Sequence, residues 1–478
     1  MDIPSSLNRL FREHRGTLPD STELLPASGS MRKYYRLKTA DYSVIGAFNP
    51  DEKENRAFTG FTRHFRGSGF KVPEILAEDL SRHFYLLEDL GDETLFMRIS
   101  SLRGKNGGHE LIRALYQRVV RELPRIQIEG GRGLDYSLCY PRDRFDHQSM
   151  LWDLNYFKYY FLKLAGISFD EQGLEDDFIR LIRSLEKAGA EDFMYRDFQS
   201  RNIMLRGSEL YYIDYQGGRK GPLQYDLASL LWDAKADLGT ELRRELLELY
   251  LKEVQNYKKV DAESFSDLYY QFVYIRIMQA LGAYGYRGFY ERKEHFLLSI
   301  PYAINNLRYL LEHHPLPSSM KQLVKCLYAI AGDPSLEFSF GSQQGLHLSI
   351  HSFSYKKGLP RDFSGNGGGF VFDCRSLPNP GREEKYKALT GKDKPVAEFL
   401  ESEPAVQAFM ENCKQLVASS VENYLGRGFS HLMVSFGCTG GQHRSVWCAE
   451  NLMKAMVKKF DIHVTIKHRE IKDGKKEV

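Results

Sequence analysis

Apolar and polar residues alternate along the first part of the chain, as they do in strands. Residues 24–39 predict two strands joined by a turn of small residues, and residues 42–49 predict a third strand. A helix closed by glycine follows over 51–69. An apolar strand over 83–92 then ends in an acidic turn. This part of the chain therefore predicts an open sheet with one helix.

The spacing changes further along, because apolar residues from 108 to 325 recur every three or four positions. That period predicts helices. The helical pattern is interrupted at 192–220, where two β-like runs, 202–205 and 209–215, flank the turn residues RGS. Such an arrangement predicts a hairpin inserted among helices.

A third pattern begins after a break at 312–345, which carries prolines and turn-forming residues. Residues 431–460 predict an apolar strand, a glycine loop and a helix that starts near Arg444. We therefore expect four segments: a β-rich lobe (1–90), a helical lobe (91–330), a linker (331–342) and an α/β domain (343–478).

Composition narrows the class of protein. A chain of 478 residues with 42% hydrophobic and 27% charged residues is too long for one core. It has neither a membrane-length apolar run nor a signal-peptide core, which predicts a cytoplasmic protein without a membrane partner. The six cysteines lack metal-binding spacing and fit free thiols. A net charge of +3 demands no nucleic acid, although the basic end of the chain leaves RNA as a weaker candidate partner.

Three oxygen-bearing residues, Asp197, Asn202 and Asp214, surround the predicted hairpin. Phosphoryl transfer needs a carboxylate to accept the hydroxyl proton and oxygen ligands for Mg²⁺. In a kinase catalytic loop the base precedes the metal-binding Asn by five positions, as Asp197 precedes Asn202 here. Each residue alone also fits an ordinary turn. Together they predict an ATP- and Mg²⁺-dependent kinase with an α+β protein-kinase-like bilobal fold, followed by the separate α/β domain.

The expected nucleotide site lies in the β-rich lobe. The turn Ser28, Gly29 and Ser30 stands where kinases fold a loop over the phosphates, although a plain hairpin turn explains it equally well. The backbone of Glu88 and Leu90 is expected to meet adenine. Kinases usually carry a Lys on the third strand, and the matching run VIGAFN has none. The cation would come from Arg32, Lys33 or Lys38, or Mg²⁺ and backbone donors would suffice.

The residues YRDFQSRNIM and IDYQGGRKGPLQYDLASLL resemble the aminoglycoside phosphotransferase and choline kinase-like superfamily. Within it they look closest to the bacterial anomeric kinases for N-acetylmuramate and N-acetylglucosamine. The resemblance implies that Asp197 is the base and that Asn202 and Asp214 bind Mg²⁺. It also implies structural roles at the site for Tyr195 and Asp226. Arg196 and Gln199 are predicted to hydrogen-bond at the surface, or else to lie near substrate or phosphate.

A second candidate site follows the strand at 431–438. Backbone amides at a helix N-terminus, joined by His and Arg, predict a phosphate ligand. A Cys, five residues and an Arg, followed by Ser445, also match the spacing of cysteine-dependent phosphatases. A glycine-rich turn with a buried Cys is the structural alternative. The expected phosphate-binding residues are Cys438, Thr439, Gly440, Gly441, Gln442, His443 and Arg444.

The segments SFSYKKGLP, FVFDCRSLPNP, LTGKDKPV and GCTGGQHRS resemble, in this order, the C-terminal domain of the RapZ/YvcJ family. That resemblance implies recognition of glucosamine-6-phosphate and, in some members, of RNA. Asp373, Arg375 and Asn379 are the implied sugar-binding candidates. The family's N-terminal P-loop domain has no counterpart here, since GxxxxGK[ST] does not occur in the sequence.

Taken together, these resemblances predict a kinase that phosphorylates an N-acetylated amino sugar in cell-wall recycling. Its small-molecule partners would be the sugar substrate and a sugar phosphate sensed by the C-terminal domain. Two alternatives remain. One is a regulatory metabolite- or RNA-binding protein with an inert kinase fold, and the other is a C-terminal Cys-dependent phosphatase.

Overall fold

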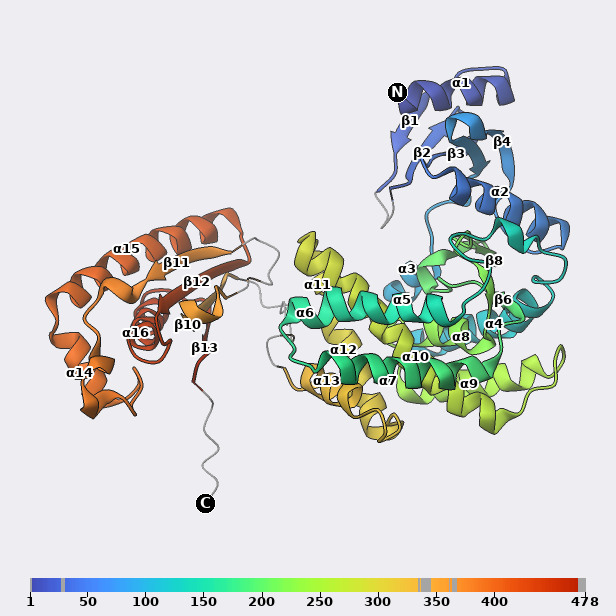
Figure 1. The fold of residues 1–478 in the computed structure, drawn as a ribbon. Coiled ribbons are helices and arrows are strands. Elements are labelled where there is room, and N and C mark those ends of the chain that lie inside the picture. Colours follow the sequence, from blue (N-terminus) through green and yellow to red (C-terminus); the bar gives the residue numbers. More distant parts are fainter. Residues whose placement is uncertain are drawn as a thin grey trace. The chain divides into compact units, whose positions relative to one another are not determined.

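The computed structural model describes residues 2–26, 31–333, 336, 345–360, 362 and 368–471. The chain divides into one unit of Met1–Gly285 and Ser299–Pro334 and a second unit of Tyr286–Leu298 and Ser335–Val478. The first unit has a β-rich lobe and a helical lobe, and the second contains a parallel sheet (Figure 1). The predicted fold class, a kinase-like bilobal fold followed by an α/β domain, is confirmed.

The β-rich lobe is an antiparallel sheet in the order β1-β2-β3-β5-β4. Helix α1 (Ile3–Arg15) packs on one face of it, where Leu7 and Phe11 meet Tyr35 and Leu37. Helix α2 (Glu52–Gly67) lies on the other face, with the Phe58 ring 5.3 Å from that of Tyr85. The strands are β1 (Ser21–Leu24), β2 (Lys33–Lys38), β3 (Ser43–Phe48), β4 (Ile75–Asp79) and β5 (Phe84–Glu88).

Helices make up most of the second lobe (Figure 1). The longest are α4 (Gly108–Ile128) and α10 (Ala262–Tyr284), and α10 is buried along much of its length. The other α-helices described in this lobe are α3 (Leu95–Leu102), α5 (His147–Phe157), α6 (Lys163–Ala165), α7 (Glu171–Leu185), α8 (Leu223–Leu231), α9 (Thr240–Val254), α12 (Ile300–His313) and α13 (Lys321–Ala331).

The predicted hairpin is present between these helices. Strand β7 (Ile203–Arg206) pairs with β8 (Glu209–Tyr212) across a tight turn, in the register Ile203↔Tyr212 and Arg206↔Glu209. A second short pair, β6 (Asp192–Met194) and β9 (Arg219–Gly221), brackets the hairpin. Pairing of β6 with β9 brings the two ends of the segment between them together, so residues far apart in sequence can share one site.

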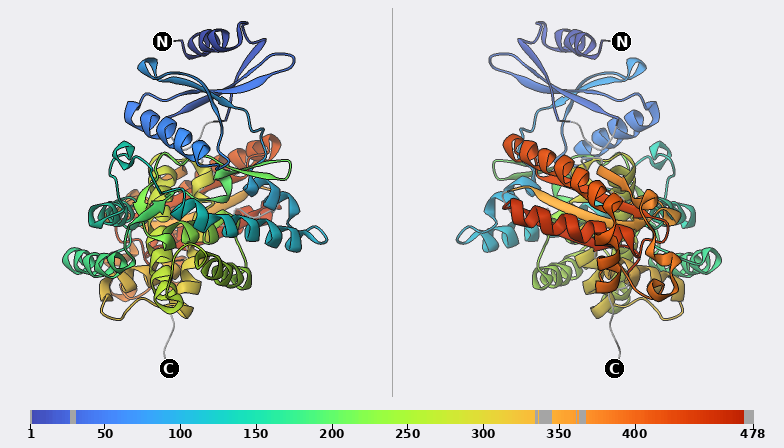
Figure 2. Two further views of the ribbon diagram at one scale, coloured as in Figure 1. Left: turned by 90° about the vertical axis from the view of Figure 1, so that its right-hand side faces the viewer. Right: turned by 90° about the vertical axis from the view of Figure 1, so that its left-hand side faces the viewer.

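The second unit has a parallel sheet in the order β11-β12-β10-β13. Leu348 and Ile350 of β10 and Val434 and Phe436 of β12 belong to its buried core. Helices α15 and α16 lie side by side on one face of the sheet (Figure 2). The elements are β10 (His347–Ser354), β11 (Gly369–Asp373), β12 (His431–Cys438), β13 (His463–His468), α11 (Glu294–Leu297), α14 (Lys394–Ser402), α15 (Pro404–Arg427) and α16 (Arg444–Lys459).

Helix α13, the last helix of the first unit, begins without a side-chain cap of its own. Asp177 of α7 takes that place, because its Oδ2 accepts hydrogen bonds from the N–H groups of Gln322 (2.7 Å) and Leu323 (2.9 Å). The Asp177 side chain is 2% exposed, and Arg180 pairs with its other oxygen. A cap supplied from another helix therefore fixes where α13 docks.

We expect Asp177→Ala to lower the free energy of unfolding by about 1–3 kcal/mol, because two helix N–H groups lose their acceptor. Urea unfolding followed by circular dichroism measures the change. Asp176→Ala is the matched control, since the Asp176 side chain accepts a bond from Gln172 of the same helix and from no other described residue. Equal midpoints for Asp177→Ala and the wild type would contradict this account of the cap.

Candidate functional site

Asn202 joins the three residues of the predicted catalytic constellation. Its Nδ2 donates to the backbone oxygen of Asp197 at 2.8 Å and to Oδ2 of Asp214 at 3.3 Å. The backbone N–H of Ile213 donates to the Asn202 oxygen at 3.0 Å, which closes the hairpin behind the site. The structure therefore brings Asp197, Asn202 and Asp214 together at one edge of the hairpin.

Asp214 stands where a cation could bind. Its backbone has a left-handed φ of 69°, and its side chain is 44% exposed, so a ligand can reach it. Gln216 Nε2 donates to Oδ1 at 2.7 Å. Desolvation and the negative charge of Asp197 both raise the pKa of Asp214. A bound cation would relieve this concentration of negative charge, as expected where oxygen ligands gather.

Asp226 supports the loop that leads to Asp197. This fully buried carboxylate accepts bonds from the N–H groups of Tyr195 (2.8 Å) and Arg196 (3.0 Å) and from Gln127 Nε2 (3.1 Å). Burial raises the pKa of Asp226 to about 7, although the three donors oppose the shift. The Tyr195 hydroxyl donates to the Ile213 oxygen at 2.5 Å. Tyr195 and Asp226 thus hold the loop and Asp214 in register.

Arg196 departs from the prediction of a surface hydrogen-bonding residue. Its guanidinium forms a two-pronged pair with Asp153 of α5, at 2.8 and 2.6 Å, and it lies over the rings of Phe145 and Tyr225. Asp153 is 7% exposed. Local spacing could not reveal this partner, because Asp153 precedes Arg196 by 43 positions.

The predicted nucleotide loop, Ser28, Gly29 and Ser30, lies outside the described residues. Of the other predicted nucleotide residues, Glu88 ends β5, and its carboxylate pairs with Arg206 and Arg66. The N–H of Glu88 donates to the Glu74 oxygen at 2.9 Å. Among the described residues, no hydrogen bond occupies the N–H of Leu90. That donor therefore remains open at the connection between the two lobes.

This connection is clamped by a residue that sequence reasoning missed. Arg36 of β2 donates to both Asp89 oxygens, at 2.8 and 3.0 Å, and to Asp92 at 2.7 Å. Ser43 donates to Asp89 at 2.5 Å, and the pKa of Asp89 is lowered because these donors outweigh the desolvation that would raise it. The backbone next to Leu90 is thus fixed by charged hydrogen bonds.

The three cations considered for the missing third-strand Lys differ in position. Arg32 has a side chain only 1% exposed, and its Nη2 lies 2.9 Å from Oε1 of Glu54 in α2. Lys33 is exposed, and Lys38 faces Glu23 at 3.9 Å near the surface. Only Arg32 of the three approaches Asp214, at 4.0 Å between Nη1 and Oδ1.

The second candidate site follows β12 in the other unit. Cys438 ends this strand and is 3% exposed. Its Sγ accepts a bond from the N–H of Gly441 at 3.1 Å and lies 3.2 Å from Oγ of Ser445. Gly441 has a φ of 71°, and a Cβ there would lie 2.8 Å from the Ser354 nitrogen, so only glycine fits. The loop from Cys438 therefore wraps closely around its own thiol.

The basic residues of this loop already have partners. Arg444 begins α16, and its Nη1 donates to the backbone oxygens of Arg375 and Leu377, each at 2.9 Å. His443 Nε2 lies 3.0 Å from the Tyr386 oxygen. Thr439 accepts from Ser354 Oγ at 2.6 Å, and Gln442 accepts from the Gly391 N–H at 2.8 Å, both through their backbone oxygens. These bonds give the loop, including Gly440, a defined shape.

The predicted sugar-binding residues lie beside this loop. Asp373 ends β11 and pairs in register with Gly437, next to Cys438. Arg375 donates to both Asp373 oxygens, at 2.9 and 2.7 Å, and thereby lowers the pKa of Asp373. Arg375 also lies 4.0 Å above the ring of Tyr355. Asn379 instead accepts from the Gly381 N–H at 3.2 Å and closes a turn.

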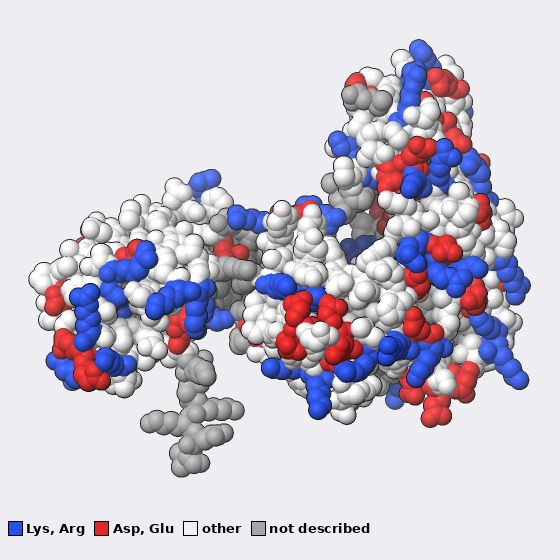
Figure 3. Space-filling view, viewed as in Figure 1, with Lys and Arg blue, Asp and Glu red and all other residues white. Residues whose placement is uncertain are grey.

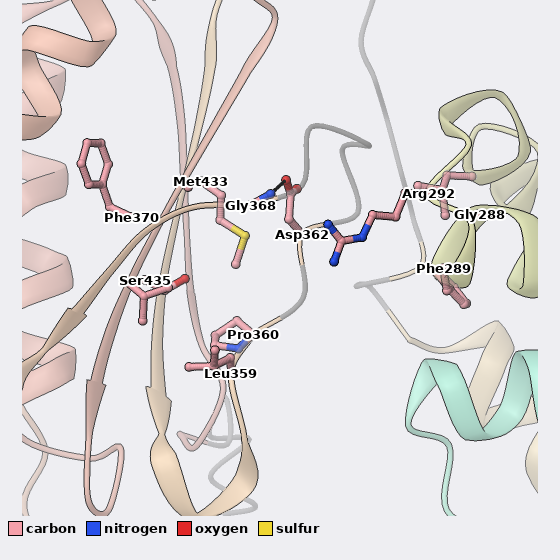
Figure 4. A pocket seen from close by; sticks show the side chains of 13 residues that line it. Gly288, Phe289, Arg292, Leu359, Pro360, Asp362, Gly368, Phe370, Met433 and Ser435 are labelled. Carbon is pink, nitrogen blue, oxygen red and sulfur yellow. Dashed lines mark hydrogen bonds between the residues drawn. The ribbon is translucent and has the colours of Figure 1, made fainter.

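One cavity of the second unit is separate from the loop. It has a volume of about 420 Å³ and is lined by Met433 and Ser435 of β12 and by parts of 288–297, 359–362 and 368–371 (Figure 4). It adjoins the middle of β12, whereas Cys438 stands at the carboxyl end of the strand.

Acidic and basic side chains lie interspersed on the face of each unit that Figure 3 shows.

All six cysteines lie within the described residues and are free thiols. Within the same residues, no helix is both long and apolar enough to pass through a bilayer. Clusters of three or more His, Cys, Asp or Glu able to hold a metal are also missing from the described part of the chain. A Mg²⁺ ion held by one or two protein groups together with substrate phosphates needs no such cluster.

Known proteins resemble the two parts of the chain separately. The C-terminal part, residues 346–472, matches the model of the RapZ C-terminal domain. A nucleotide-binding protein of Ruegeria sp. (strain TM1040) is 42% identical over 130 residues, which are 27% of this chain and 41% of that protein. One from Lactiplantibacillus plantarum is 37% identical over 142 residues, 30% of this chain and 46% of that protein. The chain thus spans less than half the length of these relatives.

Solved structures similar to the chain include two choline kinases. The enzyme from Cryptosporidium parvum has a TM-score of 0.44 at 11% identity, covering 64% of this chain and 93% of that one. The enzyme from Streptococcus pneumoniae has a TM-score of 0.43 at 15% identity, covering 64% and 99%. The model of the phosphotransferase enzyme family matches residues 22–262, which include β2–β9, most of β1 and the whole β7–β8 hairpin. The chain therefore belongs to the phosphotransferase enzyme family, with a RapZ-type C-terminal domain added to it.

Proposed function

We propose that the protein is an ATP-dependent phosphotransferase that acts on a hydroxyl of an amino sugar of the N-acetylmuramate or N-acetylglucosamine type. The observation that carries the proposal is the convergence of Asp197, Asn202 and Asp214, which Asn202 holds together. The amino-sugar substrate rests on the sequence resemblance of the second motif around Asp214. A cytoplasmic location is proposed with it, since free thiols suit a reducing compartment.

In this proposal Asp197 accepts the proton of the sugar hydroxyl and orients its oxygen for attack. Asn202 donates through Nδ2, so its Oδ1 is the atom left for a metal, together with the carboxylate of Asp214. The raised pKa of Asp214 fits a site that normally holds a cation. Mg²⁺ bound there would neutralise charge on the nucleotide phosphates. The open N–H of Leu90 suits the edge of adenine.

For the second unit we propose a sensor of a sugar phosphate at the loop from Cys438 to Arg444. The loop offers backbone amides at the start of a 16-residue helix, an arrangement that favours anions. Arg375 and Asp373 stand beside it for the sugar hydroxyls. With a sugar kinase and a sugar-phosphate sensor on one chain, binding of a sugar phosphate to the second unit would signal how much phosphorylated sugar is present.

A phosphatase is the second candidate for this loop. In its favour, Cys438 Sγ accepts a hydrogen bond from the Gly441 N–H and lies 3.2 Å from the Ser445 hydroxyl, so two polar groups adjoin the candidate nucleophile. Arg444 weakens this alternative, because its Nη1 is already bonded to two carbonyl oxygens and not directed at the loop. A regulatory protein with an inert kinase fold is the remaining alternative, and the intact Asp197, Asn202 and Asp214 speak against it.

Asp197→Asn should lower kcat for phosphoryl transfer to the best sugar by about 10²–10⁴-fold, because the hydroxyl proton loses its acceptor. The assay follows ADP release with ATP, Mg²⁺ and a panel of muramic, glucosamine and galactosamine derivatives, and EDTA should abolish transfer. Asp192→Asn is the matched control: Asp192 starts β6 but pairs with Lys258 at 2.7 Å. A wild-type chain that transfers to no sugar would support the inert fold.

Cys438→Ser should leave the affinity for glucosamine-6-phosphate within about threefold, a change below ~1 kcal/mol, because a sensor binds phosphate through backbone amides. Isothermal titration of the full chain measures this affinity. The wild type should release no inorganic phosphate from the same compound. Cys413→Ser, in the core of the same unit, is the control for folding. Phosphate release by the wild type that the Cys438 variant loses would instead establish the phosphatase.

A further inference from the structure

A buried cation, Arg32, stands on the α2 side of the sheet in the β-rich lobe. The side chain of Arg32 is 1% exposed, whereas the next residue, Lys33, is exposed. Burying a charge costs free energy unless partners are placed around it. The groups around Arg32 therefore show how its buried charge is stabilised.

Sheet register explains why Arg32 points toward α2. Lys33 pairs with Phe48 and Tyr34 pairs with Ala47, and Arg32 directly precedes this ladder. Tyr35 and Leu37 face α1 in the core of the lobe. Since side chains alternate along a strand, Arg32 and Tyr34 face the opposite side, where α2 lies. On that side the third strand carries Ser43, Ile45 and Ala47, none of which is basic, whereas Arg32 directly precedes the neighbouring strand β2.

Three groups fix the orientation of this guanidinium. Glu54 of α2 accepts from Asn49 Nδ2 at 2.8 Å through Oε2 and leaves Oε1 for Arg32 at 2.9 Å. The Tyr34 hydroxyl accepts from Arg32 Nη1 at 3.2 Å, and the ring of Phe58 lies 5.7 Å below. The Asp51 side chain caps α2 by accepting from the Glu54 N–H at 3.1 Å, which holds the carboxylate in place.

The same guanidinium reaches toward the hairpin that carries Asp214. Its Nη1 lies 4.0 Å from Oδ1 of Asp214, the carboxylate proposed to hold the metal. In kinases a Lys on the third strand, paired with a helix Glu, contacts the nucleotide phosphates. The pair of Arg32 and Glu54 has the same relation to a helix and to a metal-binding Asp, but it starts from a different strand.

We propose that Arg32, held by Glu54, is the phosphate-binding cation of the nucleotide site and takes over the task of the missing third-strand Lys. This inference rests on the proposed kinase function. An Arg suits the task because its planar fork can bind a carboxylate on one side and present further N–H groups to phosphate oxygens. The pKa of Arg32 is raised by its tyrosine neighbours and Glu54 despite the opposing burial, so the charge persists.

Nucleotide binding by the full chain tests the proposal separately from catalysis. Isothermal titration compares Mg²⁺-ADP with adenosine, which lacks phosphates. Arg32→Ala should weaken ADP binding about ten- to a hundredfold, as expected for losing a charge-assisted contact, and leave adenosine binding unchanged. Arg32→Lys should recover part of the lost affinity. Lys33→Ala, at the adjacent exposed residue, is the matched control and should bind both compounds as the wild type does.

Glu54→Gln provides a second variant in case Arg32→Ala does not fold. It keeps Arg32 but loosens its orientation, so KM for ATP should rise while adenosine affinity stays constant. A purely structural Arg32 would instead weaken ADP and adenosine equally, and that result overturns the proposal. Unchanged ADP affinity in Arg32→Ala, or a wild type that binds no ADP, also overturns it. Arg32-dependent ADP binding without transfer to any sugar would refute the proposed function and leave this inference standing.

Discussion

Asp197 and Asp214, two carboxylates joined through Asn202, are the like charges around which the supporting contacts of the first unit are arranged. The charge of Asp197 and the desolvation of Asp214 together raise the pKa of Asp214, so the pair is unfavourable unless other groups compensate. Asn202 and Gln216 donate to Asp214, and the Arg32 guanidinium lies 4.0 Å from it. Two hydrogen-bond donors and a nearby guanidinium thus offset part of the negative charge gathered at Asp214.

The contacts that fix the candidate site come from both lobes of the first unit. Asp226 in α8 holds the backbone of Tyr195 and Arg196, and Asp153 in α5 holds the Arg196 side chain. From the β-rich lobe, Glu54 in α2 fixes Arg32. Loss of any of these contacts would leave a buried charged group without one of its partners, which lowers the free energy of unfolding. The geometry of the candidate site and the stability of the fold therefore depend on the same contacts.

Sequence reasoning recovered what short-range spacing encodes. The interval from Asp197 to Asn202, the hairpin between them and Asp214, and the strand, loop and helix around Cys438 all follow from neighbours along the chain. It missed Arg36, which clamps Asp89, and it left Arg32 as one of three cations. These partners are side chains brought together only by sheet register and helix packing, which no local pattern states. The roles of the individual site residues remain predictions.

The cap on α13 has a consequence for how the polypeptide is made. Its first N–H groups depend on Asp177, which stands 145 positions earlier than Gln322. Synthesis is vectorial, and domains fold from the N-terminus as the chain emerges. The acceptor has therefore left the ribosome, with time to settle in α7, well before the helix that requires it appears. For this helix the direction of translation and the order of assembly coincide.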